Sequence, residues 1–134
     1  MSVETAVLET IPLFAGLQAD DRARIAAAAD EVPVEAGSAI VEGRDFAYHF
    51  YAIVEGTADV LHDGRLLATL GQGDFFGEIG MLVTGRRTAS VVAREPMRLV
   101  ALFDQPFRRL EAEIPQFSLQ LRAAVGERGW SQIR

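Results

Sequence analysis

The 134-residue chain has no cysteine, no lysine and only two histidines, His49 and His62. A chain without cysteine cannot form a disulfide framework, a thiolate zinc site, an iron–sulfur cluster or a cysteine nucleophile. Two histidines also leave few ligands for a catalytic metal. We therefore expect neither a metal site nor catalytic residues.

Long apolar runs are missing as well. No stretch reaches the roughly 18 consecutive apolar residues that a membrane span requires. The segment Met1–Thr10 carries Glu4 and Glu9 but no basic region, so it does not have the pattern of a secretory signal. These absences predict a cytoplasmic protein without a membrane span.

Positive charge is scarce, because 13 arginines face 19 acidic residues and the net charge is −6 at pH 7. The molecule as a whole repels phosphates and nucleic acid, so any anion site must be built locally. A content of 49% hydrophobic and 24% charged residues fits a single globular domain, residues 1–134, and excludes disorder. The exclusive use of arginine, with abundant alanine, indicates a GC-rich bacterial genome.

Helical patterns occupy the two ends of the chain. A short amphipathic segment ends at Ile11-Pro12, and a helix is predicted over Asp21–Ala29, with acidic residues at its positive end. Near the C-terminus, Asp104 is a plausible N-cap for a helix to Ala112. A last helix is expected from Pro115, with Phe117, Leu121, Ala124 and Val125 on one face, ending at Gly126 and Gly129.

Between these helices the apolar period falls to about two, which predicts short strands punctuated by glycine. The dipeptide Asp63-Gly64 between Ala58–Leu61 and Leu66–Leu70 is typical of a tight hairpin. A further strand pair is expected over Ala89–Ala93 and Arg98–Phe103. Many short strands with regular turns indicate a sandwich, roll or barrel.

One segment departs from ordinary barrel sequence. Glu78–Leu82 can form a single helical turn directly after Gly77, and a helix start presents unpaired N–H groups to which a ligand can come close beside glycine. Arg87 adds a planar cation suited to phosphate, and Thr88 adds a hydroxyl. The Glu78 carboxylate can accept hydrogen bonds from two sugar hydroxyls. An anion site beside a sugar acceptor indicates a nucleotide.

The motif Phe76-Gly77-Glu78-Ile79, followed by Arg87-Thr88-Ala89, resembles the phosphate-binding cassette of cyclic nucleotide-binding domains. Such domains occur in the catabolite activator family, in regulatory subunits of cyclic-nucleotide-dependent kinases and in cyclic-nucleotide-gated channels. Ile11–Leu17 and Phe50–Gly56 also resemble family segments, so the resemblance covers nearly the whole chain. It implies an α+β fold: a jelly-roll-like antiparallel β-roll of about eight strands, with N-terminal helices, a short phosphate-binding helix and C-terminal helices.

The resemblance also implies a role for each cassette residue. Glu78 would accept from the ribose 2′-OH, and Arg87 would bind the cyclic phosphate. The Thr88 hydroxyl and the backbone N–H groups of Glu78, Ile79 and Ala89 would complete the phosphate cage, with Gly77 allowing close approach. At the position of Arg86 many family members have proline. The sequence Arg-Arg-Thr-Ala occurs in the cyclic-nucleotide-gated channels, so this difference does not argue against the cassette.

Two further groups of residues are expected to face the purine. By the same resemblance, Val60 and Ala68 would line the purine side of the roll. Arg122, Val125 and Arg128 of the last helix are the side chains that could form a lid, by stacking or apolar contact.

The implied function is binding of a 3′,5′-cyclic purine mononucleotide, with cAMP favoured and cGMP possible, and no cofactor. The domain would then be a regulatory sensor rather than an enzyme, signalling to an unknown effector protein by moving its C-terminal helices. We expect a monomer or weak dimer. Two alternatives stay open: an interaction domain of the same fold without ligand, and the regulatory fragment of a larger channel, transporter or enzyme.

Other classes are disfavoured. Only nine residues follow Val125, too few for a helix-turn-helix, and the acidic charge also argues against a nucleic-acid partner. A cupin-like enzyme or a phosphodiesterase needs several histidines or clustered carboxylates around a metal. The pair His62-Asp63 is better explained by its hairpin, and Phe75 and Phe76 by the core. Glu78 and Arg87 taken singly would be ordinary surface charges, and only their combination indicates a site.

Overall fold

The computed structural model describes residues 3–41, 49–76 and 90–128. Three short helices come first: α1 (Thr5–Leu8), α2 (Pro12–Ala15) and α3 (Ala19–Ala28). The strands follow: β1 (Asp30–Val34), β2 (Ala39–Val41), β3 (His49–Glu55), β4 (Ala58–His62), β5 (Arg65–Leu70), β6 (Phe75–Phe76), β7 (Ser90–Ala93) and β8 (Met97–Phe103). Two helices complete the described chain: α4 (Asp104–Glu113) and α5 (Pro115–Arg128).

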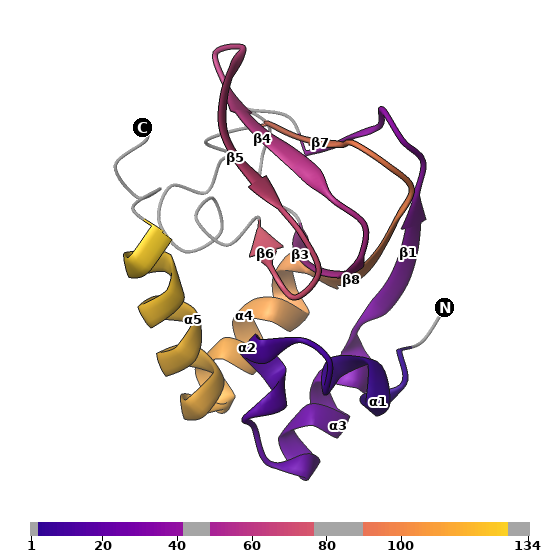
Figure 1. Ribbon diagram of the computed structural model, residues 1–134. Coiled ribbons are helices and arrows are strands. Elements are labelled where there is room, and N and C mark those ends of the chain that lie inside the picture. The colour runs from indigo at the N-terminus through magenta and orange to yellow at the C-terminus, as the bar shows by residue number, and fades with distance from the viewer. Residues whose placement is uncertain (1–2, 42–48, 77–89, 129–134) are drawn as a thin grey trace.

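The strands form two antiparallel four-stranded sheets, in the orders β1-β8-β3-β6 and β2-β7-β4-β5. Figure 1 shows the two sheets as a roll, with the N-terminal and C-terminal helices gathered together beneath it. The predicted α+β roll of about eight strands is confirmed. Among the described residues, no helix has both the length and the apolar content needed to cross a membrane.

The hairpin between β4 and β5 has the predicted turn. Asp63 and Gly64 both adopt positive φ, 51° and 77°, between the paired residues His62 and Arg65. Two consecutive positive φ values define the tight turn that matches the twist of antiparallel strands. The sequence Asp-Gly tolerates this backbone at low cost, which explains why the local prediction is confirmed.

Alternate residues of β3 face two separate cores. Phe50, Ala52 and Val54 belong to a cluster between the first sheet and the helices, whereas Ile53 belongs to a cluster between the sheets. A strand exposes successive side chains on opposite faces, so the run Phe50–Val54 has no charged residue because both faces of the strand pack against a core. The first sheet is therefore the shared wall of the roll and the helical layer.

Aromatic rings connect the helical layer to the strand β6. Phe14 of α2 lies 5.8 Å from Phe117 of α5, and Phe117 meets Phe107 of α4 edge to face at 6.0 Å. Phe107 stacks on Phe50 at 4.9 Å, and Phe50 contacts Phe75 at 5.6 Å, between ring centroids. Such pairs stabilise by about 0.5–1.5 kcal/mol beyond their buried area. The rings fix α2, α4 and α5 relative to β6.

The predicted boundaries of three helices, α3, α4 and α5, differ from those of the structure. The helix α3 begins at Ala19, so Asp20 and Asp21 lie in its first turn. Phe103 is the N-cap of α4, while Asp104 is the first helical residue and accepts a hydrogen bond from Arg108. Gly126 lies inside α5, which is described as far as Arg128, and Gly129, the other predicted end, lies outside the described residues. A helical glycine costs about 1 kcal/mol, and packing of the buried face of α5 outweighs that cost.

Candidate functional site

A tight turn, Gly71–Asp74, comes directly before β6 and the predicted phosphate-binding segment. The Asp74 carboxylate accepts from the Gly71 N–H at 2.8 Å, and the Asp74 N–H donates to the Gly71 carbonyl at 3.0 Å. Gly73 has φ +90°, and a Cβ there would lie 3.0 Å from Cδ of Pro12. Backbone hydrogen bonds join Gly73 and Asp74 to Ile53 of β3 at 2.9 and 2.8 Å. The turn is thus held by β3 and abuts α2.

The two residues of β6 that follow the turn are buried on opposite faces of the sheet. Phe75 faces the helices and Phe76 faces the roll, with 5% and 1% of their surface exposed. Both pair with β3, where Tyr51 lies opposite Phe76 and Ala52 opposite Phe75. Their predicted role as core residues is confirmed.

The predicted phosphate ligands Gly77, Glu78, Ile79, Arg87, Thr88 and Ala89 lie outside the described residues. The described chain resumes at Ser90, which begins β7 and pairs with Leu61 of β4. Since β6 belongs to one sheet and β7 to the other, the segment 77–89 connects the two sheets. Its expected ligand roles remain predictions.

The predicted purine-side residues Val60 and Ala68 lie directly opposite each other on β4 and β5. Val60 is 1% exposed, and Ala68 is half-buried against the cluster between the sheets. Val60 also pairs with Val91, one residue after β7 begins, and shares its cluster with Phe76. The structure therefore brings this pair close to both ends of the described chain that flank the cassette sequence.

A β-bulge decides which β5 side chain faces Val60. The turn pairs His62 with Arg65, and an unbroken two-residue hairpin would place Leu67 opposite Val60. The register shifts between Val60 and Leu61, so Ala68 takes that position and Leu67 is 40% exposed. A small side chain therefore faces the roll interior where a leucine would fill space.

The predicted lid residues lie on α5, but only one has a described side chain. The Arg122 guanidinium donates to the carboxylate of Glu111 on α4 and to the Ser118 hydroxyl at 3.4 Å. Val125 and Arg128 fall on the last turns of α5, and their side chains are outside the described part of the structure. In this structure Arg122 is thus engaged with α4 rather than directed to a ligand.

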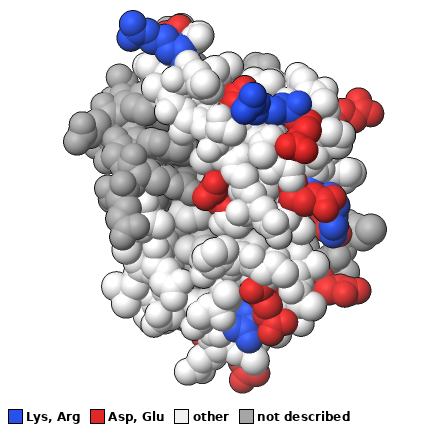
Figure 2. Space-filling model, viewed as in Figure 1, with Lys and Arg blue, Asp and Glu red and all other residues white. Residues whose placement is uncertain are grey.

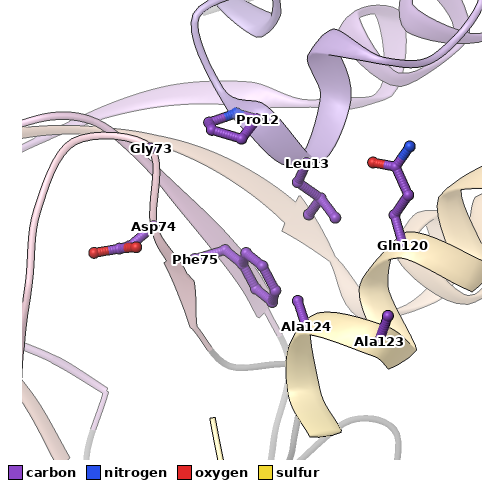
Figure 3. Close-up of a pocket in the computed structure, with 8 residues that line it drawn as sticks. All are labelled: Pro12, Leu13, Gly73, Asp74, Phe75, Gln120, Ala123 and Ala124. Atoms are coloured by element: carbon purple, nitrogen blue, oxygen red, sulfur yellow. The ribbon is translucent and has the colours of Figure 1, made fainter. Parts of the chain in front are cut away.

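A cavity of about 500 Å³ lies where α2, the turn before β6 and α5 meet, and sequence analysis did not predict it. Figure 3 shows the ring of Phe75 pointing toward Ala124, whereas the Asp74 carboxylate points away from that ring. The lining residues are Pro12, Leu13, Gly73, Asp74, Phe75, Gln120, Ala123 and Ala124. They come from three segments far apart in the chain, so no local pattern could have identified them.

Most described arginines are neutralised by a neighbouring carboxylate. Figure 2 shows blue and red side chains side by side on one face. The ion pairs are Arg22–Glu9, Arg24–Glu113, Arg94–Asp59, Arg98–Glu31, Arg98–Glu55, Arg108–Asp104 and Arg122–Glu111. The hydrogen bond from Arg98 to Glu31, with the charge of that carboxylate, raises the pKa of Arg98. These paired cations are poorly placed to bind a phosphate.

Comparison with known proteins identifies the family. Residues 31–113 match the family model described as "Cyclic nucleotide-binding domain". The chain is 36% identical over 107 residues to a cAMP-dependent protein kinase regulatory subunit of Schizosaccharomyces pombe, covering 78% of this chain and 26% of that protein. The chain thus spans about a quarter of such curated relatives. These are fungal, so they do not support the bacterial origin inferred from composition, which stays a prediction.

Solved structures agree on the fold. The catabolite activator protein of Thermus thermophilus has a TM-score of 0.77 and 31% identity, covering 87% of this chain and 57% of that one. The regulatory subunit of a cAMP-independent protein kinase A from Trypanosoma brucei has a TM-score of 0.80 at 24% identity, covering 89% and 43%. The second similarity shows the fold alone.

The family model spans the chain from β1 to the end of α4, including the whole segment 77–89 with its cassette motif. The match covers more than half of the chain, and the two-sheet roll is the fold of the solved relatives. The resemblance inferred from the sequence is confirmed: this chain belongs to the cyclic nucleotide-binding domain family.

Proposed function

We propose that this domain binds a 3′,5′-cyclic purine mononucleotide, with cAMP favoured and cGMP possible. The observation that carries the proposal is the cassette sequence with Glu78 and Arg87, which stands in the chain between β6 and β7. Of the described residues that flank it, Phe76 shares a buried cluster with Val60, and Val91 of β7 pairs with Val60. The matched family and the names of the cAMP-dependent relatives support the same ligand class.

Charge and topology favour this placement of the phosphate. The overall charge of −6 repels an anion, and most described arginines are already paired. Arg87 adds a cation on the segment that joins the sheets, where N–H groups of Glu78, Ile79 and Ala89 would complete the cage. Glu78 would read the ribose, which distinguishes a nucleotide from a simple phosphate.

The output would be a rearrangement of α4 and α5. A ligand shifts a conformational equilibrium only by its different affinity for the two states. Phe75, next to the cassette, contacts Phe50, which stacks on Phe107 of α4, and Phe107 meets Phe117 of α5. Through these ring contacts, a shift of β6 on ligand binding would be transmitted to α4 and α5. The effector protein that would respond is unknown, and we propose a non-catalytic sensor in the cytoplasm, as a monomer or weak dimer.

An alternative keeps the fold but not the ligand. The fold occurs in a trypanosomal regulatory subunit described as cAMP-independent, so fold alone does not decide the ligand. The presence of both Glu78 and Arg87 favours binding here. The relatives are about four times longer than the matched region, which favours the second alternative, a regulatory part of a larger protein.

Calorimetric titration of the purified chain with cAMP, cGMP and linear 5′-AMP tests the proposal. We expect binding of cAMP, binding of cGMP with modest selectivity between the two, and much weaker binding of 5′-AMP. The cage would enclose a compact ring phosphate with a single negative charge, which the linear nucleotide does not have. Equal affinity for 5′-AMP would rule out this cage, and absence of cAMP and cGMP binding would favour the ligand-free alternative.

A further inference from the structure

In the part of the chain that the structure describes, the strand β6 forms a short ladder with β3, preceded by the backbone hydrogen bonds of Gly73 and Asp74 to Ile53. Its described residues are Phe75 and Phe76, and these form two rungs with β3, Tyr51 to Phe76 and Ala52 to Phe75. Two rungs are fewer than the five or six of an ordinary strand. Side-chain packing therefore adds to these backbone contacts in fixing Phe76, the last described residue before the segment 77–89.

The ring of Phe76 packs against Tyr51 on the roll side of the sheet. The two ring centroids lie 5.1 Å apart, with an interplanar angle of 25°. Phe76 is 1% exposed, and its neighbour in the sequence is Gly77, the first of the predicted phosphate ligands. On the other face Phe75 contacts Phe50. Among the described residues, the stack with Tyr51 is an aromatic contact that holds Phe76 directly before the predicted phosphate ligands.

Tyr51 differs from the fully buried core aromatics. It is half-buried, and it lines a cavity of about 890 Å³ together with Ile40 and Leu99. Because space adjoins this ring, its replacement costs less packing than loss of a ring in a filled core. A change in ligand binding can thus be separated from a general loss of the fold.

We infer that Tyr51 is a positioning residue for nucleotide binding, acting by stacking on Phe76 and so holding the start of the cassette. The inference rests on the proposed function, because the cassette must bind the ligand for its position to matter. Tyr51 is not assigned a contact with the nucleotide. Its effect passes through Phe76.

The test is a double-mutant cycle on cAMP affinity, measured by calorimetry. Tyr51→Phe keeps the stack and should bind cAMP within about twofold of the wild type. Tyr51→Leu and Phe76→Leu should each weaken binding by roughly 2- to 12-fold, the range expected for an aromatic pair. The double variant should have about the same cAMP affinity as the single variant that binds cAMP less tightly. This is expected because both changes remove the same contact, the stack of Tyr51 on Phe76.

Controls separate positioning from stability. Urea unfolding of each variant gives its stability, and Ile25→Val, on α3 away from β6, lowers stability without touching the stack. This control should bind cAMP like the wild type. Tyr51→Ile, with a side chain favoured in strands, is a second non-aromatic variant in case Tyr51→Leu does not fold.

Each outcome has a clear consequence. Unchanged affinity in Tyr51→Leu or Tyr51→Ile, with a wild type that binds, overturns this inference alone. Fully additive losses at Tyr51 and Phe76 also overturn it, since they would show no shared contact. A wild type that binds neither cAMP nor cGMP overturns the proposed function and this inference with it.

Discussion

The guanidinium of Arg122 on α5 donates a hydrogen bond to the carboxylate of Glu111 on α4. The Arg122 side chain is 59% exposed and that of Glu111 is 14% exposed, so the pair lies at the surface between the two C-terminal helices. An arginine held in this way must leave its carboxylate before it can cap a purine. The lid proposed for Arg122 therefore competes with an existing contact.

We predict that Glu111→Gln raises cAMP affinity if Arg122 forms part of the lid. Loss of a surface ion pair releases at most about 1 kcal/mol, so the gain should not exceed about fivefold. Arg122→Ala should weaken binding and make Glu111→Gln silent, which calorimetry of the two single variants and the double variant would show. An effect of Glu111→Gln that persists without Arg122 would remove Arg122 from the lid, leaving Val125 and Arg128 as candidates.

Arg87→Ala should weaken cAMP binding by roughly ten- to a thousand-fold while the fold stays intact. A charge-assisted hydrogen bond contributes about 1.5–3 kcal/mol, and more is lost when an anion remains buried without its partner. Arg86→Ala, which removes the same charge one residue earlier, is the matched control and should have a much smaller effect. Titration and far-UV circular dichroism measure both. Wild-type affinity in Arg87→Ala would show that the phosphate site is assigned wrongly.

Glu78→Gln should weaken binding less than Arg87→Ala does, because an amide oxygen still accepts from a ribose hydroxyl. It should also narrow the affinity ratio between cAMP and 2′-deoxy-cAMP, since discrimination depends on a charged acceptor. Competition titrations with the two ligands give this ratio for the wild type and the variant. An unchanged ratio would mean that Glu78 does not contact the sugar.

Thr88→Ala should reduce cGMP affinity more than cAMP affinity, if the hydroxyl meets the guanine amino group of a syn base. No acidic or amide group among the lid candidates is placed to select guanine, so we expect wild-type selectivity on the order of tenfold. Parallel titrations with both nucleotides test this. A wild-type preference of a hundredfold or more for cGMP, abolished in Thr88→Ala, would make Thr88 the selector and reverse the preference for cAMP.

Gly56→Ala should destabilise the fold more than Gly37→Ala. Both glycines have positive φ, +97° and +85°, so alanine at either position incurs left-handed strain of about 1–2 kcal/mol. A Cβ at Gly56 would also lie 2.7 Å from the Pro96 carbonyl and from Met97, whereas Gly37 has open space. Such overpacking adds about 1–3 kcal/mol. Urea midpoints measure the difference, and equal midpoints would show that the β3–β4 corner relaxes freely.

Much of the fold could be predicted because its signals are local. The turn at Asp63-Gly64 depends on two residues that tolerate positive φ, and the alternation of β3 reflects strand geometry. The buried face of α5 was also predictable, since Phe117 and Leu121 recur at helical spacing and both are fully buried. The cassette could be identified because Glu78 and Arg87 stand at the spacing of a known family motif. The match of residues 31–113 to the family model confirms that the chain belongs to that family.

Other features depended on contacts between distant segments. Gly126 has a local signal for a helix end, yet α5 continues through it because its buried face packs on α2 and α4. The partner of Arg122 follows from the packing of α5 against α4, which no spacing along one helix predicts.

For the purine-side pair Val60 and Ala68, the sequence determined one feature and the tertiary structure another. Sequence alone determined that β4 and β5 form a hairpin, because Asp63-Gly64 supplies the turn. Only the tertiary structure decided that Ala68, rather than Leu67, faces Val60, because a bulge shifts the register by one residue. That shift turns a small side chain into the roll and a large one toward solvent, since successive strand residues point to opposite faces.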